Sequence, residues 1–131
     1  MSYLLDTHIL LWSLREPDRL SSRVRKLLGN PKNDLWLSPI SLWECLILEN
    51  KGRLKLSPDA QTWGRNLLKT SPLREARLTF EVALRSREVK LAHEDPADRF
   101  LAATASVYDL TLITADAKLL GGHGFKVLAS E

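Results

Sequence analysis

Short apolar segments that suit β-strands alternate with longer segments of helical periodicity along almost the whole chain. Strands that are joined through helices pair in parallel, because the helix returns the chain to the end of the sheet from which it left. We therefore predict an α/β fold with a mostly parallel sheet and helices on both faces. The predicted strands are 2–5, 34–38, 73–78, 110–114 and 125–129, and the predicted helical segments are 7–15, 20–28, 40–52, 57–70, 79–87, 94–109 and 115–122.

Two helix starts can be predicted from their residues. Ser57 is placed to cap one helix, with Pro58 at its first position, and Asp95 is placed to cap another, with Pro96 following it. Side chains of these types accept hydrogen bonds from the first N–H groups of a helix, and proline is tolerated there because those N–H groups have no helical partner.

Ligands of parallel α/β sheets bind beyond the carboxyl ends of the strands, so functional residues are expected directly after the strands.

The composition limits the class of protein. The chain has 131 residues, of which 44% are hydrophobic and 27% charged, so we expect one globular domain over residues 1–131. No apolar run reaches the roughly 20 residues of a membrane span, and the start lacks the features of a signal peptide. Cys45 is the only cysteine, which excludes an internal disulfide and fits a cytoplasmic location. The net charge of +3 is compatible with a polyanionic partner without establishing one.

Two aspartates directly follow predicted strands. Asp6 ends the strand 2–5 in an otherwise apolar stretch, and Asp116 follows the strand 110–114. A carboxylate in apolar surroundings costs free energy unless a partner offsets its desolvation. Taken alone, each residue is better explained as a helix cap or a turn residue.

Asp98 lies in the first turn of the helix that Asp95 is predicted to cap. The helix dipole favours an acid at that position. Asp98 also shares a helix face with Ala102 and Ala105, and small residues of this kind mark the side that packs. We therefore predict that Asp98 points toward the end of the sheet, whereas Asp95 serves as the cap.

Glu44 lies within the segment "LWECLIL", which is apolar on nearly every side. A helix of that composition is buried, and a glutamate is rarely buried without a partner. The alternative is that Glu44 faces solvent on a narrow polar stripe that it shares with Ser41 and Lys51.

The four acids indicate a functional site more strongly as a group than any of them does alone. In a parallel sheet, the predicted positions share the carboxyl edge, and clustered carboxylates do not all remain ionised without a cation. Ligands that are all oxygen suit Mg²⁺ or Mn²⁺. Such an ion can activate water and stabilise the charge that develops on a phosphodiester during hydrolysis. The predicted metal-binding and catalytic residues are Asp6, Glu44, Asp98 and Asp116.

The other candidate residues are better explained by structural roles than by functional ones. The three histidines have no metal-ligand spacing, and we interpret them as surface or loop residues. The tryptophans suit a core or an interface. The basic segment 51–55 is a candidate for contacts with phosphates, but a basic run of this kind is more often the solvated end of a helix. These residues are His8, His93 and His123, and Trp12, Trp36, Trp43 and Trp63.

The segments "LLDTHILLW", "SPISLWE", "HEDPADRFLAATA" and "LTLITADAKL" together resemble the PIN domain, and specifically the VapC-like toxins of prokaryotic type II toxin–antitoxin pairs. The resemblance extends from residue 3 to about residue 128. It implies a three-layer α/β/α sandwich and an endoribonuclease that depends on Mg²⁺ or Mn²⁺. By motif, the four acids named above match the catalytic acids of the family.

The resemblance also implies supporting residues and partners. Thr114 and Ser41 match positions that often support the site by hydrogen bonds, and Arg99 matches a frequent arginine to which we assign no role. Relatives usually form homodimers and are inhibited by a small antitoxin protein. Because the helices are apolar beyond the needs of a small core, a homodimer is expected here, with Trp12 and Trp63 as candidate contacts.

The sequence departs from the family pattern at two places. Ala97 stands where an aromatic residue is usual, and Leu119 and Leu120 replace a frequent acid–aromatic pair. No fifth acid is therefore available just after Asp116. Because the four central acids are present, we expect an active enzyme.

Alternatives to a toxin remain open from sequence. One is a nuclease or phosphatase outside toxin–antitoxin biology, and another is an inactive RNA-binding module. A phosphatase with an aspartyl nucleophile would normally require D-x-D, and His8 stands at its second position. The presence of all four acids disfavours the inactive module, and the sequence does not identify the RNA target.

Overall fold

A parallel five-stranded sheet forms the centre of the protein in the computed structural model, which describes residues 1–130. The strand order is β3-β2-β1-β4-β5, and each neighbouring pair is parallel. The predicted α/β class and the predicted parallel sheet are confirmed. The strands are β1 (Ser2–Leu5), β2 (Asp34–Leu37), β3 (Leu73–Glu75), β4 (Thr111–Thr114) and β5 (Lys126–Ala129).

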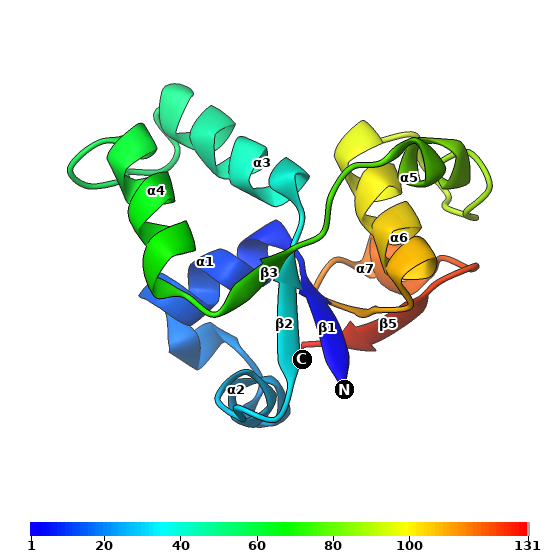
Figure 1. The fold of residues 1–131 in the computed structure, drawn as a ribbon, viewed down its shortest axis with the longest axis horizontal. Coiled ribbons are helices and arrows are strands. Elements are labelled where there is room, and N and C mark those ends of the chain that lie inside the picture. The colour runs from blue at the N-terminus through cyan, green and yellow to red at the C-terminus, as the bar shows by residue number, and fades with distance from the viewer. Residues whose placement is uncertain (131) are drawn as a thin grey trace.

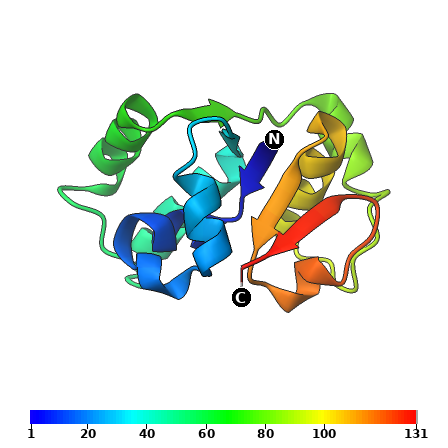
Figure 2. The same cartoon turned by 90° about the horizontal axis from the view of Figure 1, so that it is seen from below.

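Helices connect the strands and cover both faces of the sheet (Figures 1 and 2). Each predicted helical segment corresponds to a helix of the structure, and α3 begins one residue before its predicted segment. The helices are α1 (Thr7–Arg15), the 3₁₀ turn η1 (Pro17–Arg19), α2 (Ser22–Leu28), α3 (Pro39–Asn50), α4 (Ala60–Thr70), α5 (Phe80–Arg85), α6 (Pro96–Tyr108) and α7 (Ala117–Leu120). In the part of the chain described, residues 1–130, no helix has the length and apolar character needed to cross a bilayer.

Alternation of side chains along the strands divides the apolar interior into two cores. On β1, Tyr3 and Leu5 pack on the side of α1 and α2, whereas Leu4 packs on the side of α6. On β4, Ile113 and Leu112 divide in the same way. Figure 2 shows the sheet between the two groups of helices. Because successive side chains point to opposite faces, these short apolar strands can serve both cores and produce a three-layer sandwich.

Of the two predicted helix starts, the one at Asp95 and Pro96 is confirmed, and the one at Ser57 and Pro58 is wrong. Asp95 Oδ1 accepts a hydrogen bond of 3.0 Å from Asp98 N, as predicted. Ser57 does not cap α4, because Asp59 does so, accepting a hydrogen bond of 2.8 Å from Thr62 N. Two cap-type residues lie close together here, and the helix begins after the second one.

The strand order reverses between β1 and β4. From β1 the chain moves outward to β2 and β3 on one side, and then returns to β4 and β5 on the other. The connections therefore leave the carboxyl ends of β1 and β4 in opposite directions, which opens a crevice between them. Asp6 directly follows β1, and Asp116 lies two residues after the end of β4.

Candidate functional site

A cleft of about 560 Å³ lies beyond the carboxyl ends of β1 and β4. It contains all four acids that were predicted to form the site, together with the helix cap Asp95. Three further groups of the lining are basic: an arginine, a lysine and a histidine. The carboxylates of the lining are Asp6, Glu44, Asp95, Asp98 and Asp116, and the basic residues are His8, Arg19 and Lys118.

The hydroxyl group of Thr114 holds the two acids that follow strands. It donates a hydrogen bond to Asp6 Oδ2 at 2.5 Å and accepts one of 3.0 Å from Asp116 N. Asp6 occupies the N-cap position of α1 but makes no side-chain capping bond there, whereas Asp116 Oδ1 accepts a bond from Lys118 N and caps α7. The supporting role expected of Thr114 is thus observed, and capping does not account for Asp6.

Glu44 is held by a residue that the sequence did not suggest. Thr7 Oγ1 donates to Glu44 Oε1 at 2.5 Å, so the side chain after Asp6 supports the acid on α3. The expected support from Ser41 is not found, because its buried hydroxyl has no hydrogen-bond partner among residues 1–130. Ser41 is fully buried and Glu44 is half-buried, so the two do not form a solvent-exposed polar stripe.

His93 lies in the loop before α6, within the surface-or-loop interpretation made from the sequence, but it contacts an acid of the cleft. It is half-buried, and its Nε2 lies 2.8 Å from Asp98 Oδ2. A histidine five residues before an acid matches no metal-ligand spacing, so nothing in the sequence indicated this contact. His8 is exposed, as expected, but it belongs to the cleft lining. His123 is exposed.

Arg99 fixes the loop that carries His93. Its Nε donates to Ser86 O at 2.9 Å, its Nη2 to Val89 O at 2.9 Å, and its Nη1 to His93 O at 3.2 Å. The side chain is only 9% exposed and also pairs with Glu94 at 3.0 Å. Because a guanidinium group presents several N–H donors in one plane, a single buried arginine can satisfy three carbonyl groups of one loop. Arg99 therefore positions the loop, and through it the contact to Asp98.

Burial raises the pKa of three acids in the cleft. Desolvation is the largest cause for Asp6, Glu44 and Asp98, and each effect is partly offset by the hydrogen bond from Thr114, Thr7 or His93 respectively. Repulsion adds to it, since Asp6 and Asp98 both raise the pKa of Glu44. The acids are thus close enough to oppose one another's ionisation.

The donor set of the cleft fits a hard divalent cation. Carboxylate oxygens are the ligands that Mg²⁺ and Mn²⁺ prefer, and a cation would offset the repulsion among these groups. Within residues 1–130, no three His, Cys, Asp or Glu side chains are gathered closely enough to hold an ion as they stand. The four acids therefore share a cleft but not a closed set of ligands, and their role as metal ligands stays a prediction.

Comparison with known proteins identifies the family. Residues 3–120 match the PIN domain. The chain belongs to the PIN-domain family. It is also 30% identical over 117 residues to Ribonuclease VapC22 of Mycobacterium tuberculosis, a match that covers 88% of each chain. The resemblance to VapC-like proteins that the sequence motifs indicated is confirmed.

Solved structures agree with this PIN fold. One is VapBC2 from Rickettsia felis bound to a DNA fragment from its promoter, with a TM-score of 0.74, 18% identity and full coverage of both chains. Another is VapBC-1 from nontypeable Haemophilus influenzae, with a TM-score of 0.65, 21% identity and 98% coverage of both chains. At these identities the likeness establishes the fold, and the predicted three-layer sandwich is confirmed.

The two departures from the usual PIN pattern lie in packed positions. Ala97 is buried in the first turn of α6. Leu119 is fully buried in the core beside α6, with Leu4 and Leu112 among the members of that core. An acid at position 119 would have to be buried there, so the apolar residue matches its surroundings.

We predict that Asp6→Asn raises the melting temperature of the protein in EDTA at neutral pH but not at about pH 3. Burial holds the pKa of Asp6 above 3.8 in the folded chain, so the folded state binds more protons than the unfolded state. Stability then falls as pH rises through 3.8 toward the folded pKa, and asparagine escapes that loss because it does not ionise. Thermal melts of both proteins across this range, with Asp18→Asn at an exposed site as control, would reject the prediction if the gain did not grow with pH.

We predict that Arg99→Lys lowers the free energy of unfolding by roughly 2–4 kcal/mol, because one ammonium group cannot satisfy three buried carbonyl groups. Arg87→Lys is the matched control: Arg87 also pairs with Glu94, but its side chain is 66% exposed, so little change is expected. Urea denaturation of both variants measures the difference. Equal effects of the two substitutions would contradict the role given to Arg99.

Proposed function

We propose that this chain is an endoribonuclease that depends on Mg²⁺ or Mn²⁺ and acts as the toxin of a toxin–antitoxin pair. The observation that carries the proposal is the cleft at the strand-order reversal, where Asp6, Glu44, Asp98 and Asp116 lie together. Membership of the PIN family and the relative named Ribonuclease VapC22 support the same activity. No other protein class is favoured by an observation of this kind.

The four acids would hold the cation. When bound, the ion would supply a Lewis acid that lowers the pKa of water and stabilises negative charge on phosphate oxygens. Each acid contributes one oxygen to a contact already described, with Thr114, Thr7, His93 or the N–H group of Lys118. The second oxygen of each carboxylate lies outside these four contacts, which restrain the carboxylates without using their full capacity as ligands.

The chain's own groups would prepare the cleft for phosphodiester hydrolysis. Water attacks phosphorus, the bond from phosphorus to the 3′ oxygen breaks, and the products carry a 5′-phosphate and a 3′-hydroxyl group. Desolvation, with repulsion among the acids added to it, raises the pKa of Asp6, Glu44 and Asp98, so the ionised cleft is disfavoured without a cation. The contacts from Thr114, Thr7 and His93 limit reorientation of the acids, which lowers the cost of assembling the site.

We predict that the purified chain cleaves single-stranded RNA in Mn²⁺ or Mg²⁺, that EDTA abolishes cleavage, and that Asp6→Asn reduces it by at least about a hundredfold. Mapping of the cleavage ends should give 5′-phosphate and 3′-hydroxyl groups. Thermal melts show whether each variant is folded, and Asp18→Asn serves as the control for loss of a carboxylate elsewhere. A fully active Asp6→Asn protein would overturn the assignment of the chain as a metal-dependent nuclease.

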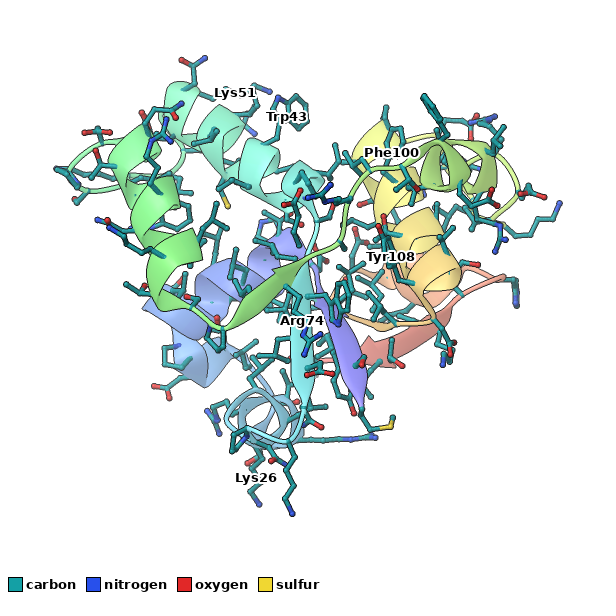
Figure 3. The ribbon with its side chains drawn as sticks, in the orientation of Figure 1. Lys26, Trp43, Lys51, Arg74, Phe100 and Tyr108 are labelled. Carbon is teal, nitrogen blue, oxygen red and sulfur yellow. The ribbon has the colours of Figure 1, made fainter. Side chains whose placement is uncertain are left out.

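We propose two protein partners, a small antitoxin and a second copy of this chain. Two of the solved structures with the same fold are those of VapBC2 from Rickettsia felis and VapBC-1 from Haemophilus influenzae. The predicted interface residues Trp12 and Trp63 are half-buried against the core beside α1, so part of each side chain already packs within the chain. Better candidates are Trp43, Phe80 and Leu84, whose side chains are 53%, 92% and 66% exposed. Figure 3 shows Trp43 projecting from α3 on the side of α5 and α6.

We predict that sedimentation finds a dimer of the isolated chain at micromolar concentration, and that Phe80→Asp shifts it toward monomer because a charge cannot be buried cheaply in an apolar contact. Co-expression with its antitoxin should give a complex that no longer cleaves RNA. A monomeric wild-type chain would contradict the first part, and an active complex would contradict the second.

A cytoplasmic location belongs to the same proposal, since the substrate is RNA.

A further inference from the structure

We propose that Arg19, held against the ring of Trp12, binds a backbone phosphate of the substrate beside the carboxylate cleft. This inference rests on the proposed function, because it names the residue that positions RNA for the same site. Both residues line the cleft that contains the acids. Neither belongs to the set of acids or to the residues that hydrogen-bond to them.

The Arg19 guanidinium group lies over an aromatic ring in the chain without any ligand. Its Cζ atom lies 4.4 Å from the centroid of the Trp12 ring, which is the distance of a cation–π contact. Trp12 is half-buried and packs against the core beside α1, so the ring is a fixed support. Arg19 is the last residue of the short turn η1. The ring of Pro17 fixes the backbone of Pro17 at the start of this turn, and the buried Leu20 follows Arg19.

Arg19 is nevertheless available to a ligand. Its side chain is 56% exposed, and its ion pair is with Glu16 at 3.5 Å, a residue that is 59% exposed. An ion pair between two exposed side chains contributes little and is easily exchanged for another partner. Over residues 1–130 no ion pair joins Arg19 to a carboxylate of the cleft. Arg19 therefore does not act as the counter-ion of these acids.

The negative charge of the cleft explains why substrate RNA needs a positively charged side chain beside it. Five carboxylates line it, and they would repel the phosphates of RNA on either side of the bond that is cut. A guanidinium group presents paired N–H groups that match two phosphate oxygens. Lys118, which also lines the cleft, offers a point charge on a flexible stem. Arg19 is the side chain whose orientation is fixed by an aromatic ring.

The test measures binding of a single-stranded oligoribonucleotide in EDTA, where no divalent ion supports cleavage, at several salt concentrations. Arg19→Gln should weaken binding roughly three- to tenfold at about 50 mM salt and make the slope of log affinity against log salt shallower by about 0.7, the value for one phosphate contact. Arg19→Lys should recover part of the affinity but lose the fixed orientation. Trp12→Leu should resemble Arg19→Lys, because the charge remains and its support is removed.

Lys26→Gln is the control for loss of one positive charge. Lys26 is exposed on α2, and Figure 3 shows it at the end of the molecule away from α3 and α6. We expect it to leave affinity and salt slope unchanged. Equal losses in Lys26→Gln and Arg19→Gln, wild-type binding by Arg19→Gln, or no binding of RNA by the wild-type chain would each overturn the proposal.

Cleavage in Mn²⁺ separates this inference from the proposed function. If the wild-type chain cleaves RNA, Arg19→Gln should raise KM at least threefold with a smaller change in kcat, since the lost contact positions substrate remote from the reacting atoms. If the wild-type chain binds RNA through Arg19 but cleaves nothing, the nuclease assignment fails and the phosphate site stands. If cleavage is normal and independent of Arg19, the phosphate site fails alone.

Discussion

The hydroxyl group of Thr114 joins the two halves of the sheet at the point where the strand order reverses. It donates to Asp6 Oδ2 after β1 and accepts from Asp116 N after β4. The strands that bring these groups together are paired directly, with Leu5 opposite Ile113 and Asp6 N bonded to Ile113 O at 3.1 Å. The remainder of the cleft is built around this fixed pair, because Glu44 and Asp98 arrive on helices that pack against the sheet.

Burial of the acids costs stability that the apolar cores have to offset. Asp6 is 8% exposed, and its raised pKa shows that the charged form is disfavoured there. Thr114 recovers only part of the desolvation cost, because a hydrogen bond to one oxygen does not replace the hydration of a whole carboxylate. The sheet has apolar cores on both faces, with Leu4 and Ile113 fully buried on opposite sides. This packing allows the protein to tolerate a group of acids that weakens the metal-free fold.

Most of the fold and part of the site follow from local features of the sequence. Strand and helix alternation predicts a parallel sheet, and parallel strands place Asp6 and Asp116 at one edge without any knowledge of contacts. Asp95 was recognisable as a cap because its neighbours Pro96 and Asp98 suit the first turn of a helix. Ser57 was misjudged because Asp59 competes for the same task two residues later, and local propensity does not decide between two adequate caps.

The supporting contacts could not be read from the sequence, since they join residues whose closeness is created by the fold. Thr7 reaches Glu44 across 37 positions of the chain, and no motif records such a pair. His93 is near Asp98 in sequence, yet its direction depends on Arg99, which holds the loop from the inside of the core. Asp98 is thus the acid whose setting depends most on a loop rather than on the sheet. Loosening of this loop would disturb Asp98 while Thr114 still held Asp6 and Asp116, so the two sides of the cleft are positioned by separate devices.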